Sequence, residues 1–138
     1  MYLLDTNVIS ETRKIRSGAA NVGVQQWSSQ VHTDELFLSV ITLLEIQQGI
    51  LSIQRKDKHQ AQILSNWFNG YVLLHFNKNI INIDQRVALA CAALHVPDKQ
   101  PANDSLIAAT ALIHDLTLVT RNTSDFIHTG VKLFNPFT

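Results

Sequence analysis

The chain has 138 residues, of which 46% are hydrophobic and 16% charged, a composition that suits a compact globular protein and argues against intrinsic disorder. A chain of this length fits one domain, so we expect a single domain over residues 1–138. The 11 Lys and Arg residues balance the 11 Asp and Glu residues, which excludes the global positive charge that drives nonspecific nucleic-acid binding.

Nothing in the sequence predicts a membrane segment or a secretory signal. The start, MYLLDT, lacks a basic segment and reaches an acid at position 5. The longest uncharged apolar run, residues 36–44, is far shorter than the roughly 20 residues needed to cross a bilayer. The single cysteine, Cys91 in ALACAAL, predicts a buried helical thiol. We therefore expect a cytoplasmic protein in a reducing compartment.

The first half of the chain predicts two strands, each followed by helix. Residues 2–4 form a short apolar run that ends on the turn and cap residues DTN, which predicts a strand opening into a helix. The cationic segment 13–18 predicts a loop, and residues 19–31 an amphipathic helix. Residues 35–39 predict a second strand, followed by a helix to about residue 55 and another over 60–70.

The second half begins with a helical pattern over residues 79–96 that Pro97 ends. A loop leads into a helix over 104–116, a strand over 117–120, a short helical turn over 124–128 and a last strand over 131–134. This order predicts a three-layer α/β/α sandwich with a largely parallel central sheet.

Four acids lie beside apolar or small-residue runs at the junctions of these elements. They are Asp5, Glu45, Asp104 and Asp125. Because ligand sites in open α/β sheets gather outside the carboxyl ends of the strands, all four can converge at one sheet edge. Several carboxylates in one pocket repel each other unless a cation compensates, and ligands that are all oxygen favour Mg²⁺ or Mn²⁺ over zinc.

Each acid also has a structural explanation when it is taken singly. Asp5 suits the cap of the helix that follows it, Asp104 complements the positive end of its own helix, and Asp125 suits a solvated turn. Glu45 fits such an explanation least well, because it lies between Leu44 and Ile46 on an apolar helix. Hydroxyls near the same junctions are suited to hydrogen-bond carboxylates or metal-bound water; they belong to Thr6, Ser39, Thr42 and Thr120.

Taken in order, these motifs resemble the PIN-domain family of metal-dependent nucleases, and most closely its small bacterial toxins of the virulence-associated-protein C type. LLDTNVIS resembles the opening strand with the first acid, and ITLLEIQQGI the helix with the family's glutamate. DSLIAATALIHDLTLVTRNTSDF resembles the third acid, helix, strand and fourth acid. The chain departs at Ser105, where Ala is common, and at Asp115, where Gly is common; neither change removes a ligand.

The resemblance implies a PIN-like fold and endoribonuclease activity on tRNA or mRNA. It implies that Asp5, Glu45, Asp104 and Asp125 bind Mg²⁺ or Mn²⁺, with Thr6 and Thr120 lining the site. We expect one or two such ions to activate water for in-line attack on a phosphodiester, which leaves a 5′ phosphate and a 3′ hydroxyl. The resemblance further implies a type II toxin with an antitoxin partner that places a basic side chain in the acidic site. It also implies a homodimer built on apolar helices, and a hetero-oligomer with the antitoxin.

Four cations near the first and fourth acids are candidate phosphate contacts, with solvated surface charge as the alternative for each. They are Arg13, Lys14, Arg16 and Arg121. The six histidines show no metal-ligand spacing, which disfavours a nuclease based on paired histidines. Two other functions stay open: a catalytically weak PIN-like module that binds antitoxin or RNA, and a phosphotransfer domain. The missing DxD pair and the absence of a suitably placed lysine argue against the phosphotransfer domain.

Overall fold

The computed structural model describes all 138 residues, and its centre is a parallel β-sheet of five strands. The strand order is β3-β2-β1-β4-β5, so β1, the first strand of the chain, lies in the middle. Leu3 pairs with Phe37 on one side and with Leu118 on the other. The strands are β1 (Tyr2–Leu4), β2 (Leu36–Ser39), β3 (Ile80–Ile81), β4 (Thr117–Val119) and β5 (Leu133–Phe134). The predicted parallel sandwich is thus confirmed.

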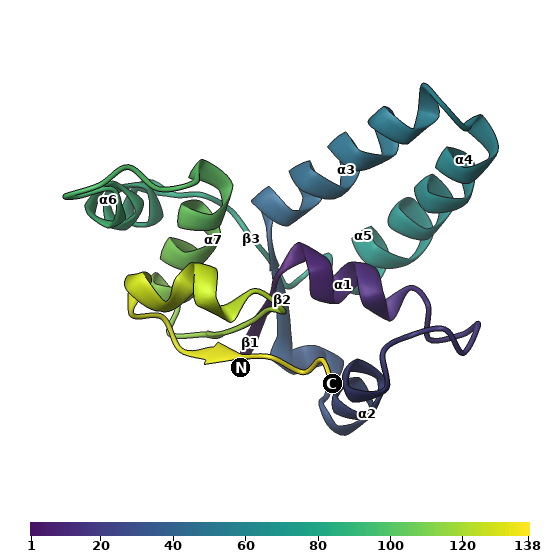
Figure 1. Cartoon of the computed structure of the whole chain (residues 1–138), viewed down its shortest axis with the longest axis horizontal. Helices are drawn as coiled ribbons and strands as arrows, with labels where there is room; N and C mark the ends of the chain where they lie inside the picture. The colour runs from purple at the N-terminus through teal and green to yellow at the C-terminus, as the bar shows by residue number, and fades with distance from the viewer.

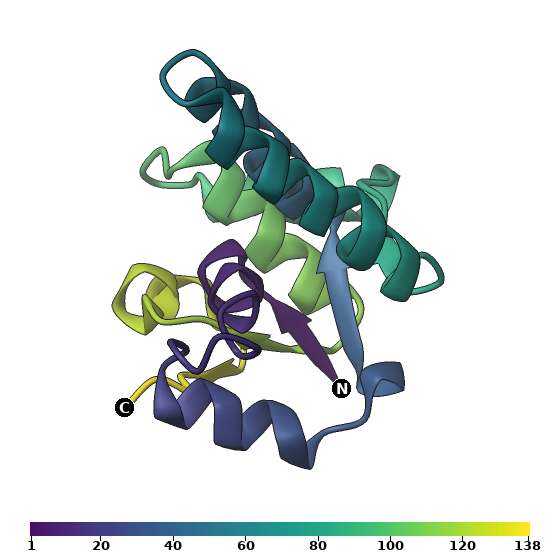
Figure 2. The same ribbon diagram turned by 90° about the vertical axis from the view of Figure 1, so that its right-hand side faces the viewer.

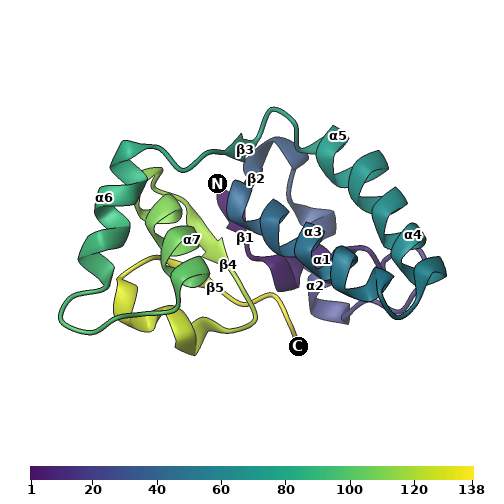
Figure 3. The same cartoon turned by 90° about the horizontal axis from the view of Figure 1, so that it is seen from above.

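Helices cover both faces of this sheet, and Figure 3 shows the two groups on either side of it. One group comprises α1 (Thr6–Thr12), α2 (Val22–Gln30), α3 (Val40–Gln54), α4 (Lys58–Trp67) and α5 (Leu73–His75). The other comprises α6 (Gln85–Leu94), α7 (Ala102–Ile113) and the 3₁₀ segment η3 (Thr123–Thr129). Two shorter segments complete the chain, the 3₁₀ turn η1 (Thr33–Glu35) and the π-helical η2 (Phe68–Val72). The helices α3 and α4 form a hairpin that extends away from the sheet (Figure 1).

The sheet separates two apolar clusters, because alternate strand residues point to opposite faces. Leu4 and Leu38 pack with Ile46 and Phe68 on the face of α3 and α4. Leu3 and Leu118 pack with Ile107 and other residues on the face of α7. Both clusters contain fully buried side chains. Their close packing fixes the ends of the strands relative to the helices that follow them.

One predicted element is wrong. The structure has a strand at Ile80–Ile81 and begins α6 at Gln85, where the sequence predicted one helix over 79–96. Asp84 caps α6 by accepting a hydrogen bond of 3.0 Å from the Val87 N–H. The spacing of Ile80, Ile83 and Val87 imitates a helical stripe, although only the part after the cap is helical.

Three further observations concern single side chains. Cys91 is buried on α6, as predicted. Asp115 follows α7 with a positive φ of 52°, the left-handed conformation that glycine adopts most easily. Phe68 belongs to the core rather than to a free surface, since it is 5% exposed.

Candidate active site

Asp5 follows β1 directly and is the most constrained of the four acids. It caps α1, with Oδ1 accepting the Thr6 N–H at 2.8 Å. Its Oδ2 accepts the Thr120 hydroxyl at 2.7 Å, which ties the end of β1 to the end of β4. The residue is 6% exposed, and this burial raises the pKa of its carboxyl, partly offset by these hydrogen bonds. Capping and a place in the site are therefore compatible.

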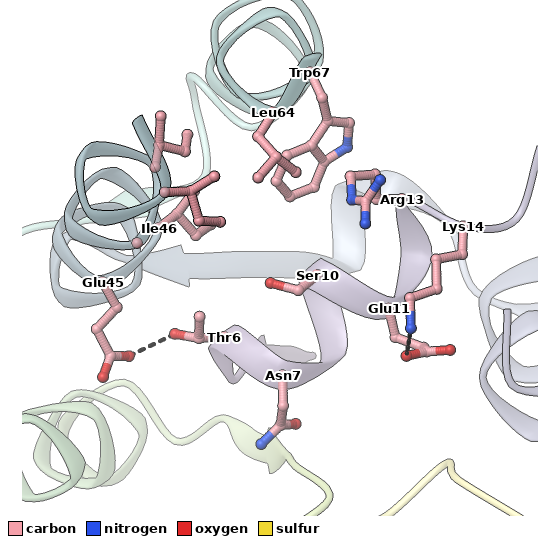
Figure 4. Close-up of a pocket in the computed structure, with 13 residues that line it drawn as sticks. Thr6, Asn7, Ser10, Glu11, Arg13, Lys14, Glu45, Ile46, Leu64 and Trp67 are labelled. Atoms are coloured by element: carbon pink, nitrogen blue, oxygen red, sulfur yellow. Dashed lines mark hydrogen bonds and ion pairs between the residues drawn. The ribbon is translucent and has the colours of Figure 1, made fainter. Parts of the chain in front are cut away.

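Glu45 lies on the second turn of α3 and faces the start of α1. Thr6 donates its hydroxyl to Glu45 Oε1 at 2.6 Å, the contact drawn in Figure 4. Asn103 donates its side-chain amide to Oε2 at 3.4 Å. The Thr42 hydroxyl lies 3.5 Å from that of Thr6, so it supports the same contact from within α3. Each oxygen of Glu45 is thus oriented by a neighbouring element.

Asp104 and Asp125 approach the first two acids from the other face of the sheet. Asp104 lies in the first turn of α7 and Asp125 in the first turn of η3. Burial raises the pKa of the Asp104 carboxyl, and the negative charges of Asp5, Glu45 and Asp125 raise it further. Asp104 therefore lies close enough to the other three acids for their charges to act on it. Neither carboxylate accepts a hydrogen bond from the chain.

No cation of the chain forms an ion pair with any of these four acids. The three ion pairs of the structure, Lys14–Glu11, Arg86–Asp84 and Lys132–Asp115, involve none of the four acids. In the present side-chain positions, no three His, Cys, Asp or Glu residues lie close enough together to hold a metal ion. The four acids are thus gathered by the fold without forming a closed ligand cage.

The predicted hydroxyls divide into two groups. Thr6 and Thr120 contact acids directly, and Thr42 contacts Thr6. Ser39 instead caps α3, because its buried hydroxyl accepts the Ile41 N–H at 3.0 Å and contacts none of the acids. Ser39 therefore sets where the glutamate's helix begins.

Two asparagines of the site were not predicted from the sequence. Asn7 donates its amide to Asp5 Oδ2 at 3.3 Å and to the Thr120 hydroxyl at 3.4 Å, while its Oδ1 accepts the Arg121 N–H at 3.1 Å. Asn103, next to Asp104, reaches Glu45. Their only signal in the sequence is their place beside an acid at a helix start.

Each of the four candidate cations lines a cavity, and one of these cavities also contains Glu45. A cavity of about 270 Å³ between α1, α3 and α4 is lined by Glu45 and Thr6 together with Arg13 and Lys14 (Figure 4). Arg13 and Arg16 also line a larger cavity between α1, α2 and α4, of about 780 Å³. Arg121 lines a third cavity, of about 450 Å³. All four therefore stay candidates for contact with a polyanion.

Comparison with known proteins decides the family. Residues 2–132 match the PIN domain family. This chain belongs to the PIN domain family. It is 34% identical to a protein named Toxin FitB from Neisseria gonorrhoeae over 99% of both chains. It is 31% identical to VapC ribonuclease Y4jK from Sinorhizobium fredii, over 99% of this chain and 98% of that protein.

Solved structures of PIN proteins have the same fold. The crystal structure of FitAcB from Neisseria gonorrhoeae superposes with a TM-score of 0.87 at 32% identity, over 99% of this chain and 98% of that one. A toxin-antitoxin complex from Klebsiella pneumoniae superposes with a TM-score of 0.68 at 31% identity, also over 99% and 98%. In this PIN domain no helix has the length and apolar character needed to cross a membrane.

Proposed function

We propose that this PIN protein is a Mg²⁺- or Mn²⁺-dependent endoribonuclease that acts as the toxin of a bacterial type II toxin-antitoxin pair. One observation carries the proposal: four acids from separate segments repel one another at the strand ends, and no cation of the chain pairs with them. Such a group needs an external cation. The ribonuclease and toxin names of its relatives agree with this function.

The donor set suits a hard divalent ion, because every candidate ligand is a carboxylate oxygen. We assign Asp5, Glu45, Asp104 and Asp125 as the residues that would hold it. Asp5 and Glu45 are already oriented by hydrogen bonds, whereas Asp104 and Asp125 accept none and are free to turn toward an ion. When bound, the ion supplies charge neutralisation at the phosphate and lowers the pKa of water.

The chain's own side chains provide the positioning. Thr120 and Asn7 hold Asp5 Oδ2, and Thr6 holds Glu45, so these two acids keep a fixed separation across the site. Arg13 and Lys14 extend from the end of α1 beside the same cavity, where they would contact RNA phosphates. An RNA phosphodiester placed there would be cleaved to a 5′ phosphate and a 3′ hydroxyl. If the substrate is cellular tRNA or mRNA, the protein cleaves it in the cytoplasm.

The cavity beside Glu45 also suits an antitoxin. The lining of this cavity also includes the apolar side chains of Ile50, Ile53 and Trp67. A partner segment with apolar side chains and one basic side chain would fill this cavity and neutralise the acids, which competes directly with metal and RNA. The similar structure from Klebsiella pneumoniae is a toxin-antitoxin complex.

A homodimer has a candidate surface on α3. Leu44 and Leu51 lie seven residues apart on this helix and are 49% and 52% exposed. Residues at this spacing share a helix face, and exposed leucines on one face indicate an interface.

The second candidate function is a catalytically weak module that binds antitoxin or RNA. It is favoured by one observation, namely that no three acids stand at metal-ligand distance as the side chains lie. Incubation of a mixed tRNA and mRNA pool with Mg²⁺, with Mn²⁺ or with EDTA separates the two functions, using Asp104→Asn as the matched variant. Cleavage that requires metal and Asp104 supports the nuclease. RNA or antitoxin binding without any cleavage supports the module.

A further inference from the structure

The main chain of Arg121 is fixed to the acidic site. Its N–H donates to Asn7 Oδ1 at 3.1 Å, and the Asn7 amide donates to Asp5 Oδ2 at 3.3 Å. The preceding residue, Thr120, donates its hydroxyl to the same Asp5 oxygen at 2.7 Å. A group bound by the Arg121 side chain would therefore be held at a defined position relative to the acids.

The guanidinium of Arg121 stacks on an aromatic ring and forms no ion pair with an acid. Its central carbon lies 4.9 Å from the centre of the Phe137 ring, a cation–π contact. It takes part in none of the three ion pairs and donates no hydrogen bond within the chain. Stacking orients the planar guanidinium and leaves its N–H donors available to an anion.

Phe137 is itself held in place by the packing of residues 136–138 against α2 (Figure 2). Asn21 Oδ1 accepts the Thr138 N–H, and its amide donates to the Thr138 carbonyl, both at 3.1 Å. Gly23 allows the close approach, because a Cβ there would lie 2.2 Å from the Pro136 carbonyl oxygen. The ring beneath Arg121 thus belongs to an ordered segment.

Beside this pair lies the cavity of about 450 Å³, whose charged lining side chains are Lys14, Arg121 and Glu11. Both oxygens of Glu11 are engaged, one by Lys14 at 3.1 Å and the other by the Asn21 N–H at 2.8 Å. Glu11 therefore forms its ion pair with Lys14, and although the charge of Arg121 also lowers the pKa of Glu11, the Arg121 guanidinium itself forms no ion pair. The cavity shares Glu11 and Lys14 with the cavity that contains Glu45, so the two adjoin.

We propose that this cavity binds a phosphodiester group of the RNA backbone that flanks the scissile one, with Arg121 as the phosphate ligand and Phe137 as its positioning residue. The proposal rests on the nuclease function proposed above. Arginine binds a phosphate through two parallel hydrogen bonds when its plane is fixed, and the Phe137 ring fixes it. The hydrogen bonds through Asn7 keep this phosphate at a constant distance from Asp5. This distance determines which phosphodiester of the RNA strand lies at the acids for cleavage.

The test measures RNA binding separately from cleavage. In the Asp104→Asn background, a fluorescein-labelled single-stranded RNA is titrated by anisotropy over a series of KCl concentrations. Arg121→Gln is expected to weaken binding about tenfold and to reduce the salt slope by about 0.7, the loss of one phosphate contact on a single strand. Arg121→Lys is expected to keep the slope. Arg55→Gln is the matched control, because Arg55 is exposed and lies at the C-terminal end of α3.

Phe137→Leu tests the positioning role with the charge of Arg121 intact. We expect RNA binding about two- to fivefold weaker, and, with Asp104 present, a higher KM with little change in kcat, since a cation–π contact is worth less than the phosphate contact. Circular dichroism establishes that each variant is folded. A Phe137→Leu protein with wild-type KM would refute the positioning role.

The remaining outcomes separate this inference from the proposed function. A wild-type protein that cleaves RNA while Arg121→Gln keeps the parent salt slope would overturn the phosphate site alone. Weaker inhibition by the antitoxin in Arg121→Gln, with an unchanged RNA slope, would also overturn it, because the cavity would then contact protein. A wild-type protein that neither cleaves nor binds RNA would overturn both.

Discussion

The Thr6 hydroxyl lies 2.6 Å from Glu45 Oε1 and joins the first turn of α1 to the second turn of α3. Asp5, the neighbour of Thr6, binds the Thr120 hydroxyl at the end of β4. Two consecutive residues therefore connect both sides of the site, one as an acid and the other as the donor that orients an acid. The distance between Asp5 and Glu45 is set by this short stretch.

Thr6→Val is expected to reduce RNA cleavage by about tenfold or more while leaving the protein folded. Valine has the shape of threonine without the hydroxyl, so Glu45 loses the hydrogen bond that orients it, and bonds to charged groups contribute about 1.5–3 kcal/mol. Initial rates on a labelled oligoribonucleotide measure the effect. Thr6→Ser keeps the donor and serves as the control. Wild-type rates in Thr6→Val would show that the contact does not orient a catalytic group.

Asp104→Asn is expected to abolish cleavage and yet to stabilise the metal-free protein at neutral pH. Burial and three neighbouring acids raise the pKa of Asp104, so its charged form is disfavoured in the folded state. Asparagine removes this repulsion with little change in volume. Because Asp104 is partly exposed, we expect a modest rise in Tm of about 2–4 °C, measured by calorimetry without metal. The exposed Asp125→Asn should give a smaller rise.

The pH dependence of stability follows from the same raised pKa values of Asp5 and Asp104. Above the ordinary carboxyl pKa of 3.8 and below the raised values, the folded state binds more protons than the unfolded state. Stability contributed by these two groups therefore falls as pH rises through that window and stays at its lower level above it. Denaturant titrations without metal should show that the unfolding free energy of Asp104→Asn falls less steeply with pH than that of the wild type. An identical pH profile in both proteins would contradict the raised pKa of Asp104.

Mg²⁺ is expected to raise the Tm of the wild-type protein because it compensates the same repulsion. Binding to the folded state alone adds about 2.7 kcal/mol at a free ion concentration one hundred times the Kd. Glu45→Gln, which removes one charge and one ligand, should reduce the metal-dependent rise. Ca²⁺ in place of Mg²⁺ tests binding without reliance on activity. Equal Tm values with Mg²⁺ and with EDTA would argue for the binding module.

The strand ends and their acids could be predicted because the signal is local. An apolar run followed by DTN marks β1 and the cap of α1, and the parallel order then brings Asp5, Glu45 and Asp104 to one edge. The strand β3 could not be predicted in the same way. Two residues, Ile80 and Ile81, give no alternation, and their pairing with β2 depends on a neighbour more than forty positions away.

The contacts that refine the site depend on tertiary packing and left no pattern in the sequence. Asn7 reaches Arg121 and Thr120 across 114 and 113 positions, and its side chain reads locally as one more turn residue. The cation–π contact between Arg121 and Phe137 forms only because residues 136–138 fold back on α2. Such long-range contacts follow from the assembled fold, whereas the acids follow from the ends of its elements.

The glycines of α2 and α3 are expected to respond oppositely to alanine. In α2, a Cβ on Gly23 would lie 2.2 Å from the Pro136 carbonyl oxygen and 2.6 Å from Thr138 Cγ2, so Gly23→Ala must displace the segment that supports Phe137. We expect a loss of about 1–3 kcal/mol in unfolding free energy, typical of overpacking. Gly49 lies inside α3 with nothing within 4 Å of a Cβ, so Gly49→Ala should gain about 1 kcal/mol of helix propensity. Urea denaturation measures both changes, and Gly49→Ala serves as the control because nothing lies close to its Cβ. A Gly23→Ala protein as stable as the wild type would mean that residues 136–138 do not pack on α2.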